Sequence, residues 1–108
     1  MPVLKLTEGE RLMVARRRRE ETQAQAAERH GVSNTRYSRW ERDLERPRVA
    51  PRLAWTDLKI HEKCLVVRRR ARVDQLTVAR ALNRCRMWVR QMERGEVDPA
   101  ELAAYWGL

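Results

Sequence analysis

The spacing of apolar and polar residues along the chain predicts short helices and little β-strand. The regular alternation of apolar and polar positions that is typical of a half-buried strand is absent, and Ala, Arg, Glu, Gln and Leu dominate. Residue types that cap or end helices interrupt the chain at short intervals. The sequence therefore predicts an all-α fold.

Polar capping residues divide the first half of the chain into three helices. Thr7 and Glu10 have the spacing of a capping box, and Gly31 can adopt the positive φ with which a helix often ends. The expected helices run from Thr7 to about Arg19, from Thr22 to about Gly31, and from a Ser33 cap to about Arg42. A helix, a tight turn and a second helix thus follow one another directly.

The two halves of the chain resemble each other. An offset of 52 residues aligns them without a gap and places Arg16-Arg17-Arg18 on Arg68-Arg69-Arg70. Further identities are Val14 with Val66, Gln23 with Gln75, Ala27 with Ala79, Glu41-Arg42 with Glu93-Arg94, and Pro47 with Pro99. In the second half we expect Asp57, Asp74 and Asn83 at the corresponding cap and turn positions.

The repeat predicts two tandem helix-turn-helix units of about four helices each. Residues 1–50 form the first unit, residues 51–57 the linker, and residues 58–108 the second, more divergent unit. The segment from Arg48 to Thr56 is either a short fourth helix or the linker itself. A terminal helix is expected from Asp98-Pro99 through Trp106, since proline is tolerated in a first helical turn.

The charge of the chain favours an anionic partner. It has 24 Lys and Arg residues against 15 Asp and Glu residues, which gives a net charge of +9. The first 54 residues hold 13 and 8 of these, and the remainder 11 and 7, so the halves carry +5 and +4. Arginine, the commoner basic residue, contacts phosphates and guanine edges well, although its abundance can also reflect coding composition. The charge therefore favours nucleic acid as the partner over an anionic membrane surface.

Metal, cofactor and enzyme chemistry are not indicated. Cys64 and Cys85 stand far apart and form no Cys-x-x-Cys pair of the kind that binds zinc, and His30 and His61 belong to no acid–base constellation. We therefore expect no cofactor and no enzymatic activity. The chain shows neither an apolar run of membrane-spanning length nor a signal peptide, so we expect a cytoplasmic protein with reduced thiols.

Residues 9–47 resemble the helix-turn-helix family of phage repressors, the lambda-repressor and Cro type that is often called Xre-like. The resemblance is carried by Gly9-Glu10-Arg11-Leu12, Arg16, Thr22-Gln23, Ala26-Ala27, Gly31-Val32-Ser33, Tyr37-Ser38-Arg39-Trp40-Glu41-Arg42 and Pro47. Glu20-Glu21 replaces the Gly-Leu that is common in the family, and Ala26 and His30 replace larger aliphatic residues. Because this core is thin, we expect Tyr37 and Trp40 to be core residues.

The resemblance implies a recognition helix from Asn34 to Arg42 that lies in the major groove. It assigns base reading to Asn34, Thr35, Arg36 and Arg39, although these polar residues can also simply solvate a helix. It assigns phosphate contacts to Gln23 and Ser33. We also expect phosphate contacts from Arg17, Arg18 and Arg42, and from Gln75 and Arg94 in the second unit. It also implies a structural ion pair between Arg16 and Glu41. Arg68 and Glu93 repeat this pair at the same separation, which favours a structural role for Arg16 over a phosphate contact.

The second unit keeps its core residues but loses turn chemistry. Arg84 stands at the position of a buried valine, and Cys85 at the position of the serine cap. Its corresponding base-reading residues are Arg86, Met87, Arg90 and Gln91. Trp88 is expected on an exposed helix face, where it contacts DNA or marks a protein interface. The alternative to base reading is a docking or dimerising module.

These features predict a sequence-specific transcriptional regulator, repressor-like and of the kind found in phages and mobile elements. The alternative is an interaction protein, such as an antitoxin or an RNA polymerase-binding protein, that docks a partner near Trp88. A second copy of the chain is a further candidate partner. RNA binding is not favoured, because interleaved aromatic residues on strands and a Gly-x-x-Gly loop are absent.

Overall fold

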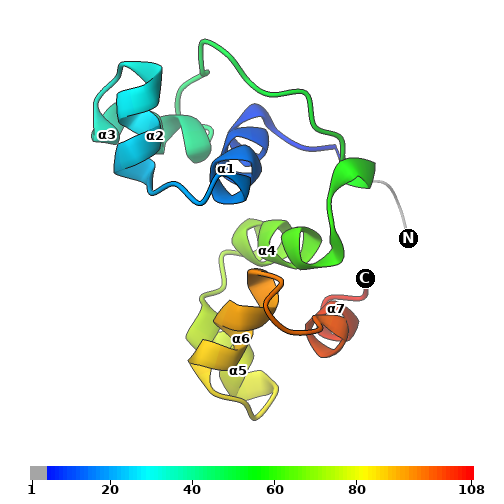
Figure 1. Ribbon diagram of the computed structural model, residues 1–108. Coiled ribbons are helices and arrows are strands. Elements are labelled where there is room, and N and C mark those ends of the chain that lie inside the picture. The colour runs from blue at the N-terminus through cyan, green and yellow to red at the C-terminus, as the bar shows by residue number, and fades with distance from the viewer. Residues whose placement is uncertain (1–4) are drawn as a thin grey trace. The chain divides into compact units, whose positions relative to one another are not determined.

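The computed structural model describes residues 5–108, and these residues form helices and connecting segments without any strand. The helices are α1 (Glu8–Arg18), α2 (Gln23–His30), α3 (Asn34–Glu41), α4 (Ile60–Ala71), α5 (Gln75–Ala81), α6 (Arg86–Glu93) and α7 (Ala100–Tyr105), with a 3-10 turn η1 (Trp55–Asp57) before α4 (Figure 1). The predicted all-α fold is confirmed. Among the described residues, no helix is both long and apolar enough to cross a membrane.

The described chain separates into two compact units between Thr56 and Asp57. This boundary lies inside the segment that the sequence predicts as a linker. Val49 to Ala54 form no helix, and the 3-10 turn follows them. A fourth α-helix between Arg48 and Thr56, one of the two expected possibilities, is therefore not formed.

Side-chain caps set the helix boundaries of the first unit. Thr7 and Glu10 form the expected capping box of α1, and Thr22 forms another with Gln25 at the start of α2. The Ser33 hydroxyl accepts the backbone N–H of Arg36 at 3.1 Å and caps α3. These bonds satisfy backbone donors that a helix leaves without a partner in its first turn.

The core of the first unit depends on two aromatic side chains. Tyr37 and Trp40 are fully buried against Leu12 and the small residues Ala26 and Ala27. A large ring buries much more apolar surface than alanine does, so the rings compensate for the short side chains of α2. The prediction that both residues belong to the core is confirmed.

Gly9 allows α1 to pass close to the end of α3. A Cβ atom at this position would lie 2.5 Å from the carbonyl oxygen of Trp40. Asp43, which follows α3, accepts the Gly9 N–H at 2.9 Å and the Thr7 hydroxyl at 2.6 Å. Its carboxylate therefore fastens the end of α3 to the start of α1.

The cap of α4 differs from the expected one. Asp57 lies in the 3-10 turn, and the N-cap residue is Lys59, whose backbone N–H donates to Glu62 at 2.8 Å. Asp57 precedes this position by two residues, so it is not the residue that adopts the capping conformation. In contrast, Asp74 caps α5 by accepting the Thr77 N–H, and Asn83 has the expected positive φ of 55°.

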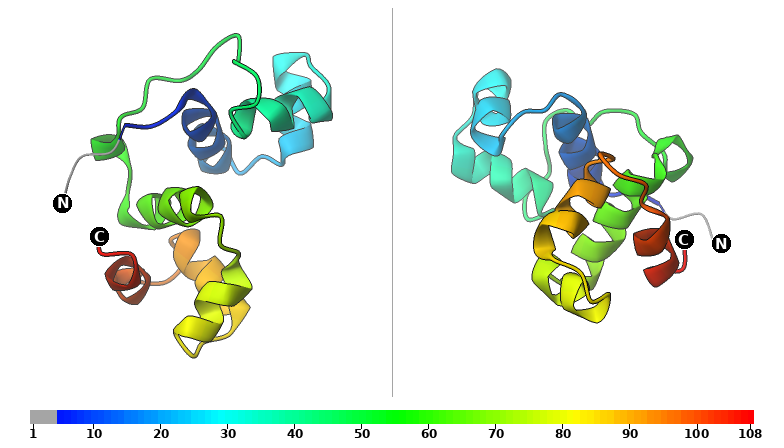
Figure 2. Two further views of the ribbon diagram at one scale, coloured as in Figure 1. Left: turned by 180° about the vertical axis from the view of Figure 1, so that it is seen from behind. Right: turned by 60° about the horizontal axis from the view of Figure 1, so that its bottom comes forward.

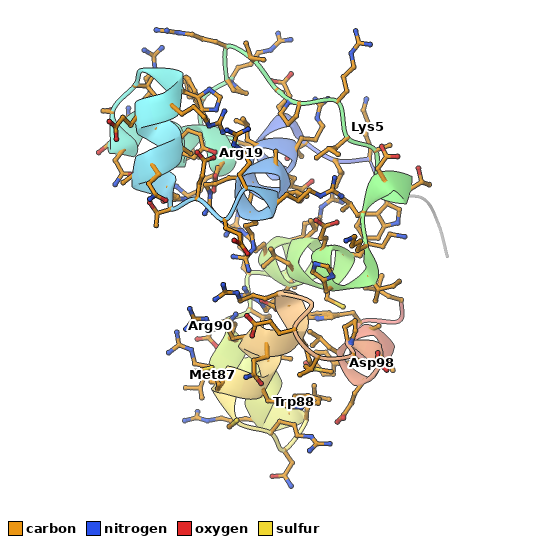
Figure 3. All side chains as sticks on the ribbon, in the orientation of Figure 1. Lys5, Arg19, Met87, Trp88, Arg90 and Asp98 are labelled. Atoms are coloured by element: carbon orange, nitrogen blue, oxygen red, sulfur yellow. The ribbon has the colours of Figure 1, made fainter. Side chains whose placement is uncertain are left out.

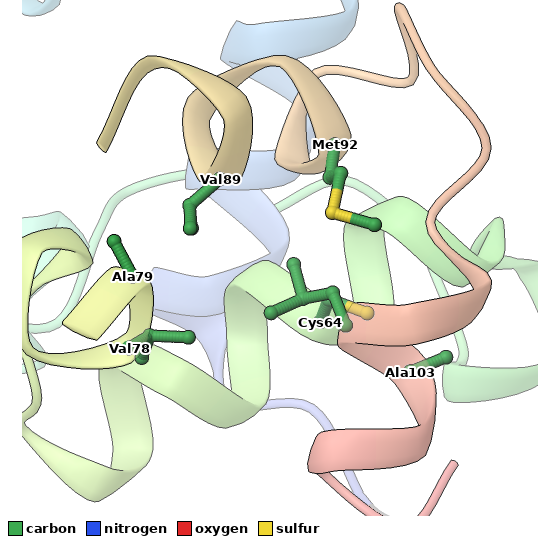
Figure 4. Packing of buried hydrophobic residues seen from close by; sticks show 7 residues of the cluster. Cys64, Val78, Ala79, Val89, Met92 and Ala103 are labelled. Atoms are coloured by element: carbon green, nitrogen blue, oxygen red, sulfur yellow. The ribbon is translucent and has the colours of Figure 1, made fainter. Parts of the chain in front are cut away.

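The second unit has its own apolar core, formed by α4, α5, α6 and α7. The fully or nearly fully buried residues are Cys64, Val78, Ala79, Val89, Met92, Leu102 and Ala103 (Figure 4). Helix α7 packs against α4, and the further views show the two side by side (Figure 2). Burial and then the charge of Glu93 raise the pKa of the Cys64 thiol to about 12, so this sulfur is a core atom and not a reactive thiolate.

Candidate nucleic-acid interface

Each unit contains one buried ion pair that joins its first and third helices. In the first unit, Nε of Arg16 lies 2.6 Å from Oε2 of Glu41, and Nη2 lies 3.2 Å from Oε1. In the second unit, Arg68 and Glu93 repeat this contact at 2.6 and 3.1 Å. Both glutamate side chains are completely buried, and the arginine side chains are 11% and 14% exposed. The bidentate geometry fixes the orientation of the third helix relative to the first.

The same ion pairs also hold the second helix of each unit. Nη1 of Arg16 donates to the carbonyl of Glu21, just before α2, at 2.9 Å. The amide of Gln23, the first residue of α2, donates to Oε1 of Glu41 at 3.1 Å. The second unit has the corresponding bonds, from Arg68 to the Val73 carbonyl at 2.9 Å and from Gln75 to Glu93 at 3.0 Å.

This network includes Gln23 and Gln75, which the sequence predicts as phosphate-contacting residues. The amide nitrogens of Gln23 and Gln75 each donate to a buried carboxylate of their own unit, and both side chains are half-buried. The sequence placed each glutamine at the start of a helix but did not show its contact with a glutamate 18 residues further along the chain. Their function in the fold is to connect the second helix to the third.

The turn between the second and third helices has the same geometry in both units. Gly31 and Asn83 have φ values of 69° and 55°, in the left-handed region. The next residue then donates back into the preceding helix, from Val32 to Ala27 at 3.0 Å and from Arg84 to Ala79 at 2.8 Å. Asparagine is the best substitute for glycine in this conformation, which explains how the second unit keeps the turn.

Helix α3 turns a polar stripe away from the core of the first unit. Tyr37, Trp40 and Glu41 are buried on one side. With 3.6 residues per turn, the opposite side carries Thr35, Ser38, Arg39 and Arg42. Thr35, Arg39 and Arg42 are exposed and Ser38 is half-buried, while Asn34 is exposed at the start of the helix. Sequence analysis identified all of these except Ser38, which only the helical phase places on the stripe.

Arg36, a predicted base-reading residue, has its guanidinium engaged within the unit. Its Nε lies 2.8 Å from Oε2 of Glu45, and its guanidinium carbon lies 5.8 Å from the centroid of the Trp40 ring. The same Glu45 oxygen accepts the indole N–H of Trp40 at 2.6 Å. The hydrogen bonds from Arg36 and then from Trp40 lower the pKa of Glu45. Arg36 thus differs from the other predicted base-reading residues of α3, because its guanidinium is held by an ion pair within the unit. Its partner Glu45 was not predicted as a site residue from the sequence.

Helix α6 turns a different stripe away from the core of the second unit. Val89, Met92 and Glu93 are buried, and the opposite side carries Met87, Arg90, Gln91 and Arg94. Met87 and Arg90 are exposed (Figure 3). Arg86, at the helix start, is also exposed, whereas Gln91 is half-buried. Cys85, at the N-cap position, makes no side-chain capping bond. Arg94 is exposed and lies 3.4 Å from Glu96.

Trp88 is not presented on an exposed helix face, contrary to the expectation from the sequence. It is half-buried and packs against the core of the second unit. The guanidinium carbon of Arg84 lies 4.5 Å from the centroid of its ring, and Arg84 also pairs with Glu101 at 3.1 Å. Arg84, which corresponds to Val32 in the first unit, therefore helps to cover this ring. The sequence did not indicate this contact, because Arg84 lies in the turn before α6 and not on a helix face.

Two further predicted phosphate contacts, Arg17 and Arg18, also make interactions within the fold, and His30 lies against the core of the first unit. Arg17 is half-buried and Arg18 is exposed, and both interact within the fold. His30 ends α2 and stacks on Tyr37, with ring centroids 5.5 Å apart. Burial and then the charge of Arg29 lower the pKa of His30. Within residues 5–108, the side chains of His, Cys, Asp and Glu form no group that could hold a metal ion.

Comparisons of the chain with protein-family models, with curated proteins and with solved structures found no match.

Proposed function

We propose that this protein is a sequence-specific regulator of transcription that binds double-stranded DNA through α3 and, in its second unit, α6. The observation that carries the proposal is the matched arrangement of three helices in each unit. A buried Arg–Glu pair fixes the third helix, a left-handed turn precedes it, and its outer face carries exposed arginines. We interpret the two units as tandem helix-turn-helix modules.

The dimensions and charge of DNA suit such an outer face. The major groove of B-DNA is about 12 Å wide and admits a single α-helix, whose exposed side chains then reach the base edges. Asn34 pairs best with adenine and Arg39 with guanine. The net charge of +9 gives long-range attraction to the phosphate backbone. A repressor-like role follows from the family resemblance of residues 9–47, and such a regulator acts in the cytoplasm of a bacterial or phage-infected cell.

Selection of binding sites from a random duplex library tests this function. We expect the full chain to select one discrete sequence and to lose affinity steeply as salt rises, because phosphate contacts release counterions. Arg39→Ala should lower affinity for the selected site on the order of 10- to 100-fold and remove one guanine preference. Salt-sensitive binding without any preferred sequence would contradict the proposal.

A single chain should prefer an asymmetric site. The residues on the outer stripes of α3 and α6 differ at most matched positions. The nine residues from Arg48 to Thr56 span at most about 30 Å when fully extended, so the two sites must be close along the duplex. Footprinting of the selected site distinguishes this arrangement from a homodimer, since a palindrome occupied by two first units would show that the chain dimerises instead.

One set of observations favours the alternative of a helix-turn-helix-fold interaction protein, such as an antitoxin or an RNA polymerase-binding protein. Leu76, Met87 and Tyr105 of the second unit are large apolar residues that are 42%, 55% and 41% exposed. In this alternative the second unit docks a protein. Specific DNA binding that depends on α6 would exclude a purely docking role for that unit.

A further inference from the structure

We propose that α6 reads a sequence with a thymine and a guanine at its centre, through Met87 and Arg90. This inference rests on the proposed function and specifies the DNA that the second unit takes. It also states that α3 and α6 read different bases, so that one chain joins two unlike half-sites.

Met87 is the first residue of the outer stripe of α6. Residues 87, 90, 91 and 94 follow the spacing i, i+3, i+4 and i+7, which places them on one helix face. Met87 is 55% exposed although it is strongly apolar, and it does not belong to the core cluster of its unit. Its position corresponds to Thr35 on α3, so the second unit has an apolar side chain where the first has a hydroxyl.

The charges around Met87 favour DNA as the partner that covers it. Arg86 precedes it and Arg90 lies one helical turn beyond it, and both are exposed. Among the described residues, no ion pair engages either of these guanidinium groups. The one carboxylate of α6 belongs to Glu93, which is buried against Arg68. An apolar group beside two exposed arginines matches a groove that combines phosphates with thymine methyl groups.

Each side chain then has one preferred base. The C5-methyl group of thymine is the apolar feature of the major groove, and it offers Met87 a surface that no other standard base provides. Arg90 can donate two hydrogen bonds to O6 and N7 of guanine. Arg90 replaces Ser38 of the first unit, which moves the guanidinium to a neighbouring position on the outer face. The two helices therefore cannot read the same sequence in the same register.

Base analogues in the duplex selected by the full chain test this assignment. Selection with Met87→Ala identifies the thymine whose preference is lost, and uracil at that position then removes only its methyl group. We expect the native chain to bind the uracil duplex about four-fold more weakly, the effect of one buried methyl group. Met87→Ala should bind the two duplexes equally. Ile60→Ala, which removes an exposed apolar side chain from α4, should behave like the native chain.

The guanine is tested in the same way with 7-deazaguanine, which lacks the N7 acceptor. The native chain should lose affinity about ten-fold on this duplex, whereas Arg90→Ala should bind the two duplexes equally. Arg80→Ala removes an exposed arginine from α5 and should keep the native preference. Circular dichroism and urea unfolding of each variant show whether it is folded.

The outcomes separate this inference from the proposed function. If Met87→Ala and Arg90→Ala keep every base preference of the native chain while Arg39→Ala loses one, α6 does not read bases. The inference is then overturned, and the first unit alone supports DNA binding. If the native chain selects no sequence at all, the proposed function fails as well.

Discussion

Glu41 and Glu93 are the residues on which the orientation of the third helices depends most directly. Each carboxylate is fully buried and accepts hydrogen bonds from an arginine and a glutamine on two other helices. A buried charge that loses its partner is strongly destabilising, whereas an exposed pair contributes about 1 kcal/mol or less. Removing one partner of either buried pair should therefore lower the free energy of unfolding much more than removing one partner of an exposed pair.

Glu41→Gln should lower the free energy of unfolding by about 3 kcal/mol or more, because it leaves the nearly buried Arg16 without a charged partner. Urea unfolding measures this change. Glu96→Gln breaks the exposed pair with Arg94 and should change stability by less than about 1 kcal/mol. Replacing both Arg16 and Glu41 with apolar residues should restore part of the loss, and equal effects of Glu41→Gln and Glu96→Gln would refute this argument.

The ion pair with Glu45 determines whether the Arg36 guanidinium is free to contact DNA in the proposed complex. Glu45→Gln weakens the hold on the Arg36 guanidinium and frees it to reach a phosphate or a base. Log affinity for DNA should then fall more steeply with log salt, by about 0.9 for one additional phosphate contact. Glu28→Gln makes the same charge change at an exposed position of α2 and should leave the slope unchanged. Identical slopes for native and Glu45→Gln protein would show that Arg36 does not reach the phosphates.

His30 makes stability depend on pH in one direction. Because burial lowers its pKa in the folded state, the unfolded chain binds the proton more readily. Protonation therefore favours unfolding, and stability should fall as pH drops through the unfolded value of 6.5. Urea unfolding of native protein and of His30→Gln at pH 7.5 and 5.5 isolates this effect. The pH dependence should be smaller in His30→Gln, and an unchanged dependence would assign it to another group.

At the scale of the element, the two units have corresponding helices but different residues at the turns and caps between them. Glu20 and Arg72 occupy matched positions after the first helix of each unit, and both have a positive φ, at 56° and 57°. Residues with a Cβ atom adopt this conformation at a cost of about 1 to 2 kcal/mol. Both turns therefore form without glycine, the residue that suits this conformation best.

The caps of α3 and α6 provide a matched test of local stability. Ser33 accepts the Arg36 N–H, while Cys85 makes no such bond. Ser33→Ala should lower the free energy of unfolding by about 1 kcal/mol, and Cys85→Ser should raise it by a similar amount, as urea unfolding can measure. Cys85→Ala adds no acceptor and should not stabilise. A stabilisation by Cys85→Ala equal to that by Cys85→Ser would mean that capping is not the cause.

At the scale of the molecule, the positive charge belongs to both units. The halves carry +5 and +4, and each presents two exposed arginines on the outer side of its third helix. These are Arg39 and the C-cap residue Arg42 for α3, and Arg90 and the C-cap residue Arg94 for α6. In the proposed complex, this distribution gives general attraction to the duplex along the whole chain. Specificity must then come from the side chains that reach base edges, and the differences between the two outer stripes make the two half-sites unlike.

The sequence by itself determined the features that depend on neighbours a few residues away. Thr7, Thr22, Ser33 and Asp74 cap helices, and Gly31 and Asn83 form left-handed turns, because these bonds and dihedral angles are local. The repeat also indicated the corresponding helices of the two halves. The cap predicted at Asp57 was wrong by two residues, because the actual N-cap residue, Lys59, is not of a type that usually caps a helix.

Only the tertiary structure decided which partner each long side chain takes. Arg36 contacts Glu45 and Trp40, Gln23 contacts Glu41, and Arg84 lies over Trp88. These choices depend on how the helices pack and on the helical phase of each residue. A flexible arginine or glutamine reaches several candidate partners, and the sequence alone does not show which of them packing brings within a few ångströms.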